Sequence, residues 1–443
     1  MHAIASTGAA PQTPRQMAAM KGAYWALLAF FVVYCVRPED WIHPLAVIPL
    51  AKITGVLAVL AFLMSVGSAR TRFPRELLYF LLLVVQLFMT VPFSPVWRGG
   101  AFWNTVGFAK LLLILPVMIL AAANLHRLRQ LIFIQGGSVA TLAVVSIIQN
   151  RRGQGRLEAA SNSVGNPNDF AMALCLALPF CLAFLLRTKS IWRKALWALG
   201  ILAMSYAVFL TQSRAGLLAL IISMGACVWE FAIRGGRRYL LLPAIGAAIV
   251  LAAVAGKGLR ARWAGTFGGD LSNPEARVAY GSAMERREML RLSIEDTLKH
   301  PIFGLGTGNF TASSKHWRET HNNFTQYSCE GGIPALILFL MILWRAFSNV
   351  REAKRLAPMG SEEALWASAL NASLLGFVVG SMFASVAYLF FPYFLIIYTS
   401  ILRGVVASNQ APPPEPVAAK QVPKPQRSLF ELGRASSFSG SSS

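Results

Sequence analysis

Charged residues are scarce in this sequence, and acidic residues are the scarcest of them. Charged side chains make up 14% of the 443 residues, with 19 Asp and Glu against 41 Lys and Arg and a net charge of +22. Soluble domains carry roughly 25% charged residues, which argues against a large soluble enzyme. The basic residues stand between apolar segments, where membrane topology and anionic lipid headgroups explain them better than nucleic acid does.

Cysteine and metal-ligand patterns are also sparse. Of the five cysteines, four lie in apolar runs and Cys329 borders a polar loop, without any CxxC or Cys/His spacing. His316 and His321 are five residues apart, which differs from the i/i+4 spacing of a helical metal pair. The G-x-S-x-G nucleophile motif is absent as well. We therefore expect neither a disulfide framework nor a metal site or other cofactor.

Apolar residues dominate instead, at 55% of the chain. Segments of about 17–25 apolar residues are long enough to cross a bilayer. Such segments fall near 22–36, 45–66, 77–93, 101–123, 129–149, 168–186, 192–211, 214–233, 239–256, 331–349, 365–386 and 387–404. The sequence predicts an all-α polytopic membrane protein of about twelve transmembrane helices, with the last two open to a different division.

Basic residues occupy alternate loops, which predicts the orientation. The basic loops are 70–75, 127–129, 187–194, 234–238 and 345–355. With an even number of spans, the positive-inside rule puts both termini in the cytoplasm. The stretch 150–160 is basic on the outer side; it is either tolerated there or faces an anionic substrate.

The predicted spans divide the chain into five parts. A cytoplasmic N-terminal segment, 1–21, precedes the first nine helices in 22–256. Residues 257–330 form one large extracytoplasmic loop, which we expect to contain short helices because it has helical patterning and glycine punctuation. The last three helices fall in 331–406. The Pro- and Ser-rich stretch 407–443 predicts a disordered cytoplasmic tail.

The motif Asn166-Pro-Asn168-Asp169 opens the sixth predicted span. Asn or Asp before an apolar helix is a good N-cap, and this role alone could explain the motif. Alternatively, the helix N-terminus and the Asn168 side chain help to line a site for an anion.

Arg214 lies between two spans with hardly any loop, in the sequence TQSRAG of residues 211–216. An arginine at the edge of the hydrocarbon is costly unless it reaches water or has a partner, so it is a functional candidate. Its guanidinium suits phosphate because the donor fork binds two oxygens and stays charged.

Residues 285–310 combine basic residues with a glycine-rich turn. The spacing predicts a helix over 286–299, which Pro301 ends before Gly304, Gly306 and Gly308. The glycines fit a tight turn back to the membrane, without the βαβ context of a dinucleotide site. Arg286, Arg287 and Arg291 could be a solvated helix face or an anion site.

The last motif, HNNFTQYSCEGGIPA at 321–335, leads into the tenth predicted span. His321 is either structural or a proton-exchanging group, the role for which histidine is best suited near neutral pH. Glu330 could orient His321 only if the fold brings the two together, because nine residues is not a same-face spacing.

Taken together, these motifs resemble the O-antigen ligase family, which shares its signature region with Wzy-type polymerases and protein O-oligosaccharyltransferases. The resemblance rests on TQSRAG, on the run from ERREML to KHPIFGLGTGNF, and on the His-Asn motif followed by Glu-Gly-Gly. The NPND element is similar to one that recurs in this superfamily. The specific match covers about 160–340, and the first five spans match only in hydropathy.

The resemblance implies a membrane bundle like those of lipid-linked-sugar (GT-C-like) glycosyltransferases, and roles for single residues. Arg214 and Arg286 would grip the pyrophosphate of the lipid donor, with Arg287 as the neighbouring candidate, and His321 would take part in catalysis. Further substrate-binding candidates are Asn168, Asn322 and Glu330.

The activity implied is metal-independent, inverting transfer of a glycan at the periplasmic face. The donor would be undecaprenyl pyrophosphate and the acceptor a hydroxyl of a lipid A-core sugar. Polymerase or protein-glycosylating activity would use the same motifs. A transporter is the alternative from another class; Lys110 is its obvious intramembrane charge, but the polar motifs gather at one membrane face, which favours an enzyme.

Overall fold

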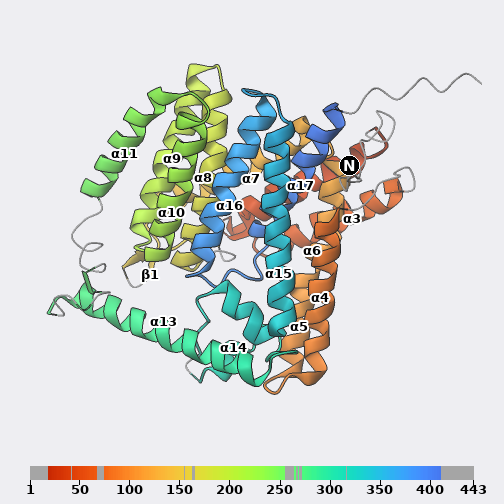
Figure 1. Cartoon of the computed structure of the whole chain (residues 1–443), viewed down its shortest axis with the longest axis vertical. Helices are drawn as coiled ribbons and strands as arrows, with labels where there is room; N and C mark the ends of the chain where they lie inside the picture. Colours follow the sequence, from red (N-terminus) through yellow and green to blue (C-terminus); the bar gives the residue numbers. More distant parts are fainter. Residues whose placement is uncertain are drawn as a thin grey trace, which may run out of the picture. The chain divides into compact units, whose positions relative to one another are not determined.

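A computed structural model describes residues 18–410, except 41, 67–73, 154, 162–164, 255–263, 266, 267, 269–271 and 316. The chain divides into two units, Met1–Ser408 and Asn409–Ser443. Within the second unit only residues 409 and 410 are described, as the last turn of a helix, so the predicted tail lies almost wholly outside the described residues. The first unit is helical almost throughout (Figure 1).

The helices follow one another with short connections. In the first part of the chain they are α2 (Lys21–Val36), α3 (Leu50–Val66), α4 (Arg75–Phe93), α5 (Arg98–Ala109), α6 (Leu111–Ala121) and α7 (Leu125–Gln149). A two-stranded antiparallel hairpin, β1 (Arg152–Gly153) and β2 (Arg156–Leu157), then pairs Gly153 with Arg156. After it come α8 (Pro167–Arg187), α9 (Ile191–Leu210), α10 (Arg214–Cys227) with the π-helical turn Val228–Ile233, and α11 (Leu241–Val254).

The remaining helices include those outside the apolar segments. They are α13 (Pro274–Lys299), the short α14 (Phe310–Ser313), α15 (Asn323–Leu356), α16 (Glu362–Ser381) and α17 (Phe391–Gln410). The helix predicted over 286–299 is therefore correct at its C-terminal end but begins at Pro274. It ends where Pro301 prevents a further turn.

Each of the twelve predicted apolar segments contains a helix, but the count of twelve spans is not confirmed. Among the described residues, nine helices are long and apolar enough to cross a membrane, with α5 and α6 together forming one of them. The helices α2, α3 and α11 are shorter. Large apolar side chains such as Leu196, Leu199 and Leu202 on α9 are exposed, as expected for a surface in contact with lipid. The protein is a multi-pass membrane protein.

Two of the predicted cytoplasmic loops, 127–129 and 187–194, meet at one end of the bundle. The Glu362 carboxylate at the start of α16 pairs with Arg129 at 3.2 Å and with Arg187 at 2.7 Å. Arg187 ends α8, whereas Asn168 lies at its start, so the NPND motif lies at the opposite end. The hairpin, the start of α10 and α13 also lie at that opposite end (Figure 1). The alternation of loops deduced from charge thus agrees with the arrangement of the helices.

Small residues bring α8 and α10 close together near this second end. A Cβ atom added to Gly216 would lie only 2.4 Å from the Ala171 Cβ, so this crossing requires glycine. Close approach through small residues is a common way to pack membrane helices, because it maximises van der Waals contact. The crossing fixes the start of α10, and therefore Arg214, against the start of α8.

Candidate functional site

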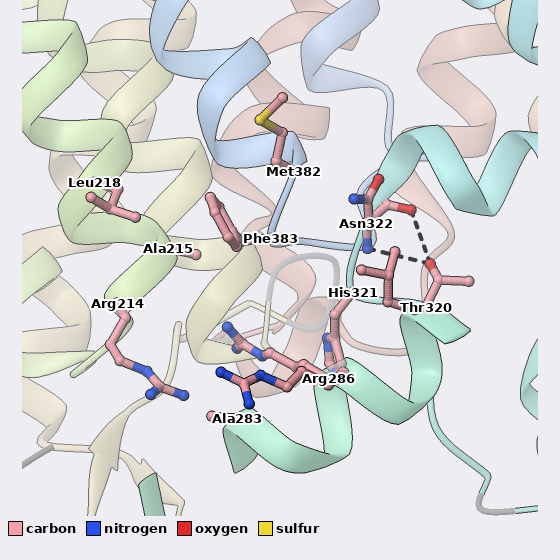
Figure 2. Close-up of a pocket in the computed structure, with 12 residues that line it drawn as sticks. Arg214, Ala215, Leu218, Ala283, Arg286, Thr320, His321, Asn322, Met382 and Phe383 are labelled. Atoms are coloured by element: carbon pink, nitrogen blue, oxygen red, sulfur yellow. Dashed lines mark hydrogen bonds between the residues drawn. The ribbon is translucent and has the colours of Figure 1, made fainter. Parts of the chain in front are cut away.

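A cavity of about 340 Å³ opens at this end of the bundle, between α10, α13 and the loops before α15 and after α16 (Figure 2). Its lining residues come from four separate parts of the chain. They are Arg214, Ala215, Leu218, Ala283, Arg286, Arg287, Leu290, Thr320, His321, Asn322, Met382 and Phe383. The structure therefore brings five predicted site residues together: the three arginines, His321 and Asn322.

Arg214 is the first residue of α10, and a network of polar side chains fixes this helix start. The Ser213 hydroxyl accepts a hydrogen bond from the Gly216 N–H at 3.1 Å and donates one to Asn168 Oδ1 at 2.8 Å. Asn168 does not line the cavity; it is buried and supports the helix start. The Asn166 side chain caps α8, accepting from the Asn168 N–H at 2.9 Å. The NPND motif thus provides both the predicted cap and a contact to Ser213.

Arg286 and Arg287 both come from α13, but they differ in surroundings. Arg286 is partly buried and lies close enough to His321 to lower the pKa of its imidazole, whereas the side chain of Arg287 is exposed. Figure 2 shows Arg286 beside His321, with Arg214 on the other side of the cavity. Arg291 lies on the solvated face and pairs with Glu288 at 2.8 Å and Glu295 at 2.9 Å. Of the three, Arg286 is the one in position to act with His321.

His321 adopts a left-handed backbone conformation just before α15, with φ of 54°. This conformation is uncommon for residues other than glycine, and such strain is often found at functional sites. Asn322 follows as the N-cap of α15, and its Oδ1 accepts from the N–H groups of Phe324 at 2.9 Å and Thr325 at 3.2 Å. Asn322 therefore has a structural role as well as its place in the cavity wall.

The electrostatic environment keeps His321 neutral. Burial, and then the positive charges of Arg286, Arg318 and Arg156, lower the pKa of the imidazole from 6.5 to about 4. At neutral pH the ring is therefore uncharged and retains a nitrogen lone pair. A neutral imidazole can accept a hydrogen bond from a hydroxyl group, which an imidazolium cannot do.

Glu330 lies apart from the cavity and holds the glycine-rich turn in place. Its carboxylate accepts from the Phe310 N–H at 3.3 Å and from Gln326 Nε2 at 3.5 Å, and its backbone oxygen accepts from the Gly306 N–H at 2.9 Å. Gly304 and Gly306 have φ of 61° and 91°, so the turn needs glycine. The structure does not bring Glu330 to His321. The glycines form the predicted tight turn.

Several residues at the site were not recognised in the sequence. Arg156 belongs to the basic outer stretch, but nothing in the sequence placed it near His321. Met382, Phe383 and Ser385 were assigned to a transmembrane segment, whereas they form the loop between α16 and α17. Glu319 lies two residues before His321, and burial raises the pKa of its carboxyl group. These contacts depend on tertiary structure. Only Arg156 had a signal in the sequence, through the basic character of 150–160.

Among the described residues there is no group of three or more His, Cys, Asp and Glu side chains that could hold a metal ion. His316, one half of the pair considered in the sequence, lies outside the described residues.

Two comparisons with known proteins gave different results. The comparison with curated proteins found no match, whereas the comparison with protein-family models agrees with the motifs. Residues 199–340 match the family model Wzy_C, described as O-antigen ligase. This segment covers less than half of the chain, but it contains Arg214, Arg286 and His321, the three cavity residues that come from separate motifs. The resemblance to the O-antigen ligase family that the motifs indicated is thus confirmed over residues 199–340.

Proposed function

We propose that this protein transfers a glycan from undecaprenyl pyrophosphate to a hydroxyl group of a lipid A-core sugar, at the periplasmic face of the bacterial inner membrane. The observation that carries the proposal is that Arg214, Arg286 and His321 surround one cavity although they come from α10, α13 and the start of α15. The cavity lies at the end of the bundle opposite the basic loops that contain Arg129 and Arg187, which supports a periplasmic site and cytoplasmic termini.

The two arginines suit the leaving group of this reaction. A new bond forms between the acceptor oxygen and the anomeric carbon, while the bond from that carbon to the pyrophosphate oxygen breaks. Negative charge then grows on the departing pyrophosphate. Guanidinium groups held in place beforehand stabilise such charge strongly at a site with little water, and this can replace a divalent cation. Attack from the face opposite the pyrophosphate would invert the anomeric configuration.

His321 is proposed to accept the proton of the acceptor hydroxyl. Its neutral state at pH 7 leaves a lone pair available, but a pKa of about 4 makes it a weak base. Bound pyrophosphate would offset the positive charges of Arg286 and Arg156 and would therefore raise the pKa of His321. The base would thus become stronger once the donor is in place.

The mixed character of the cavity fits a lipid-linked donor. Leu218, Leu290 and Phe383 line it beside the arginines. One site can therefore contact both an apolar chain and a charged headgroup. Such a donor enters from the membrane, and its activated bond is made before it arrives. Neither a nucleotide nor a cofactor is required in this scheme.

The test uses cells that lack their own ligase but make lipid-linked O-polysaccharide. We would express the chain and, separately, its His321→Ala and Arg214→Ala forms, and analyse lipopolysaccharide by gel electrophoresis and mass spectrometry. Polymer joined to lipid A-core only with the unsubstituted protein is the expected result. Polymer that stays on undecaprenyl pyrophosphate, with the protein present in the membrane, would refute this acceptor. Longer chains in a polymerase-deficient strain, or glycan attached to protein, would instead assign one of the related activities.

A further inference from the structure

Arg156 lies on the β1–β2 hairpin beside the residues that lead into α10, and two of its hydrogen bonds go to neutral acceptors. Its Nε donates to the backbone oxygen of Thr211 at 2.8 Å, and its Nη2 donates to Asn168 Oδ1 at 2.9 Å. Both acceptors are uncharged, and these two bonds fix the orientation of the guanidinium group. This arrangement suits a residue that contributes charge at a defined position.

Asn168 connects Arg156 with the start of the helix that carries Arg214. The same Oδ1 atom that accepts from Arg156 also accepts from the Ser213 hydroxyl at 2.8 Å. An amide oxygen has two lone pairs, so both bonds can form at once. Ser213 in turn caps α10 directly before Arg214. The positions of the two arginines are therefore set by one buried amide group.

The positive charge of Arg156 also influences His321, the candidate catalytic base. Arg156 is one of three arginines, with Arg286 and Arg318, whose charge acts on His321. Two carboxyl groups, those of Asp169 and Glu319, lie in the same region and interact electrostatically with each other. A site with this many guanidinium groups favours a ligand with several negative charges over a neutral sugar.

We infer that Arg156 binds a phosphate group of a lipid substrate together with Arg214, and that Asn168 positions both arginines. This inference rests on the proposed function and adds a third guanidinium to the site. Phosphate could come from two sources, the pyrophosphate of the donor or the phosphate groups of a lipid A-type acceptor. Binding measurements with each lipid separate the two sources.

The test measures binding rather than transfer. The full-length protein, in phosphatidylcholine nanodiscs, is titrated with undecaprenyl pyrophosphate and, separately, with phosphorylated lipid A-core. Arg156→Gln is compared with the unsubstituted protein and with Arg152→Gln. Arg152 lies on the same hairpin, but it is exposed and its Nε donates to Asn150 Oδ1 at 2.7 Å, so it serves as the matched control.

We expect Arg156→Gln to weaken binding of one of the two lipids by about tenfold or more, since loss of one partner of a close charge pair usually costs at least this much. The affected lipid identifies the source of the phosphate. Arg152→Gln should bind both as the unsubstituted protein does, and Arg156→Lys should restore part of the affinity because it keeps the charge. Dependence on salt concentration should also decrease in Arg156→Gln.

Unchanged affinity of Arg156→Gln for both lipids would overturn the inference while leaving the proposed function intact. If the unsubstituted protein binds neither lipid, the proposed function fails and the inference with it. If Arg156→Gln does not give monodisperse protein, Asn168→Asp replaces it. This variant keeps an oxygen that can accept the hydrogen bonds from Arg156 and Ser213, but it adds a negative charge beside Arg156, so affinity should fall; unaltered affinity for both lipids would again overturn the inference.

Discussion

The hydroxyl of Ser385 accepts a hydrogen bond from the backbone N–H of His321 at 2.8 Å, although 64 residues separate the two in sequence. Next to this bond, the N–H of Val386 donates to Asn323 Oδ1 at 2.7 Å. The loop between α16 and α17 therefore holds the chain on both sides of Asn322. Because the backbone of His321 is left-handed, it needs such external contacts to stay in place.

Ser385→Ala should lower the rate of transfer by roughly tenfold through misplacement of His321, since small errors in the position of a reacting group reduce rates strongly. Donor affinity should stay unchanged, because Ser385 itself contacts the histidine backbone rather than the arginines. Steady-state kinetics and donor binding check this. Ser381→Ala is the control, since its hydroxyl bonds to the Val378 oxygen within α16. Equal rates for the two variants would show that the contact is not required for positioning.

Arg286→Ala should reduce transfer by roughly 10²–10³-fold, the range seen when one group that stabilises developing charge is removed. Arg287→Ala should cost much less, because the Arg287 side chain is exposed whereas Arg286 is partly buried beside His321. Transfer assays on the two single variants, at equal amounts of membrane protein, make the comparison. A larger loss with Arg287→Ala would assign the role to that residue instead.

His321→Gln should reduce transfer by roughly 10²–10⁴-fold if the imidazole accepts the acceptor proton. In the unsubstituted protein the rate should fall at acid pH as the imidazole becomes protonated. Because bound donor raises the pKa of His321, this fall should begin at a higher pH in kcat than in kcat/KM. The pH profile of both parameters tests this. A residual activity of His321→Gln with the same acid limb would exclude the histidine as the group that titrates.

His321 should also affect how stability depends on pH. The unfolded chain binds a proton at His321 near pH 6.5, whereas the folded protein does so only near pH 4, because burial and the nearby arginines lower the pKa. Between these values the folded state binds fewer protons, so stability decreases as pH falls through this window. Glu319 acts in the opposite sense because the pKa of its carboxyl is raised. The comparison is therefore between unsubstituted protein and His321→Gln, whose melting temperature should decline less from pH 6.5 to 4.

Gly332→Ala should destabilise the protein by about 1–3 kcal/mol or more. Gly332 has φ of 78° at the kink of α15, and an added Cβ would lie 2.1 Å from the Ile302 oxygen. Gly225→Ala in α10 is the matched control, since no atom lies within 4 Å of its added Cβ. Thermal unfolding in detergent should show a lower melting temperature only for Gly332→Ala. Similar melting temperatures would mean that the kink can relax.

The lengths of the apolar segments and the positions of the basic residues determined the helical fold of this protein from sequence alone. Because a bilayer leaves no water for backbone groups, each long apolar run had to become a helix, and each predicted segment did. Two of the basic loops, those with Arg129 and Arg187, meet at Glu362, in agreement with the predicted alternation. Arg214, Arg286 and His321 were also identifiable, since each belongs to a local motif whose spacing is recognisable without the fold.

Other features were decided by tertiary structure alone. The sequence made Glu330 a candidate for binding substrate, but its carboxylate accepts a hydrogen bond from the Phe310 N–H and lies away from the cavity. The break between α16 and α17 was misplaced, since residues 382–390 are apolar enough to pass for a helix. Arg156 and Ser385 reach the site only because the helices that flank them pack together. Local sequence carries hydrophobicity and charge, but it carries no information about which distant side chain supplies the second half of a hydrogen bond.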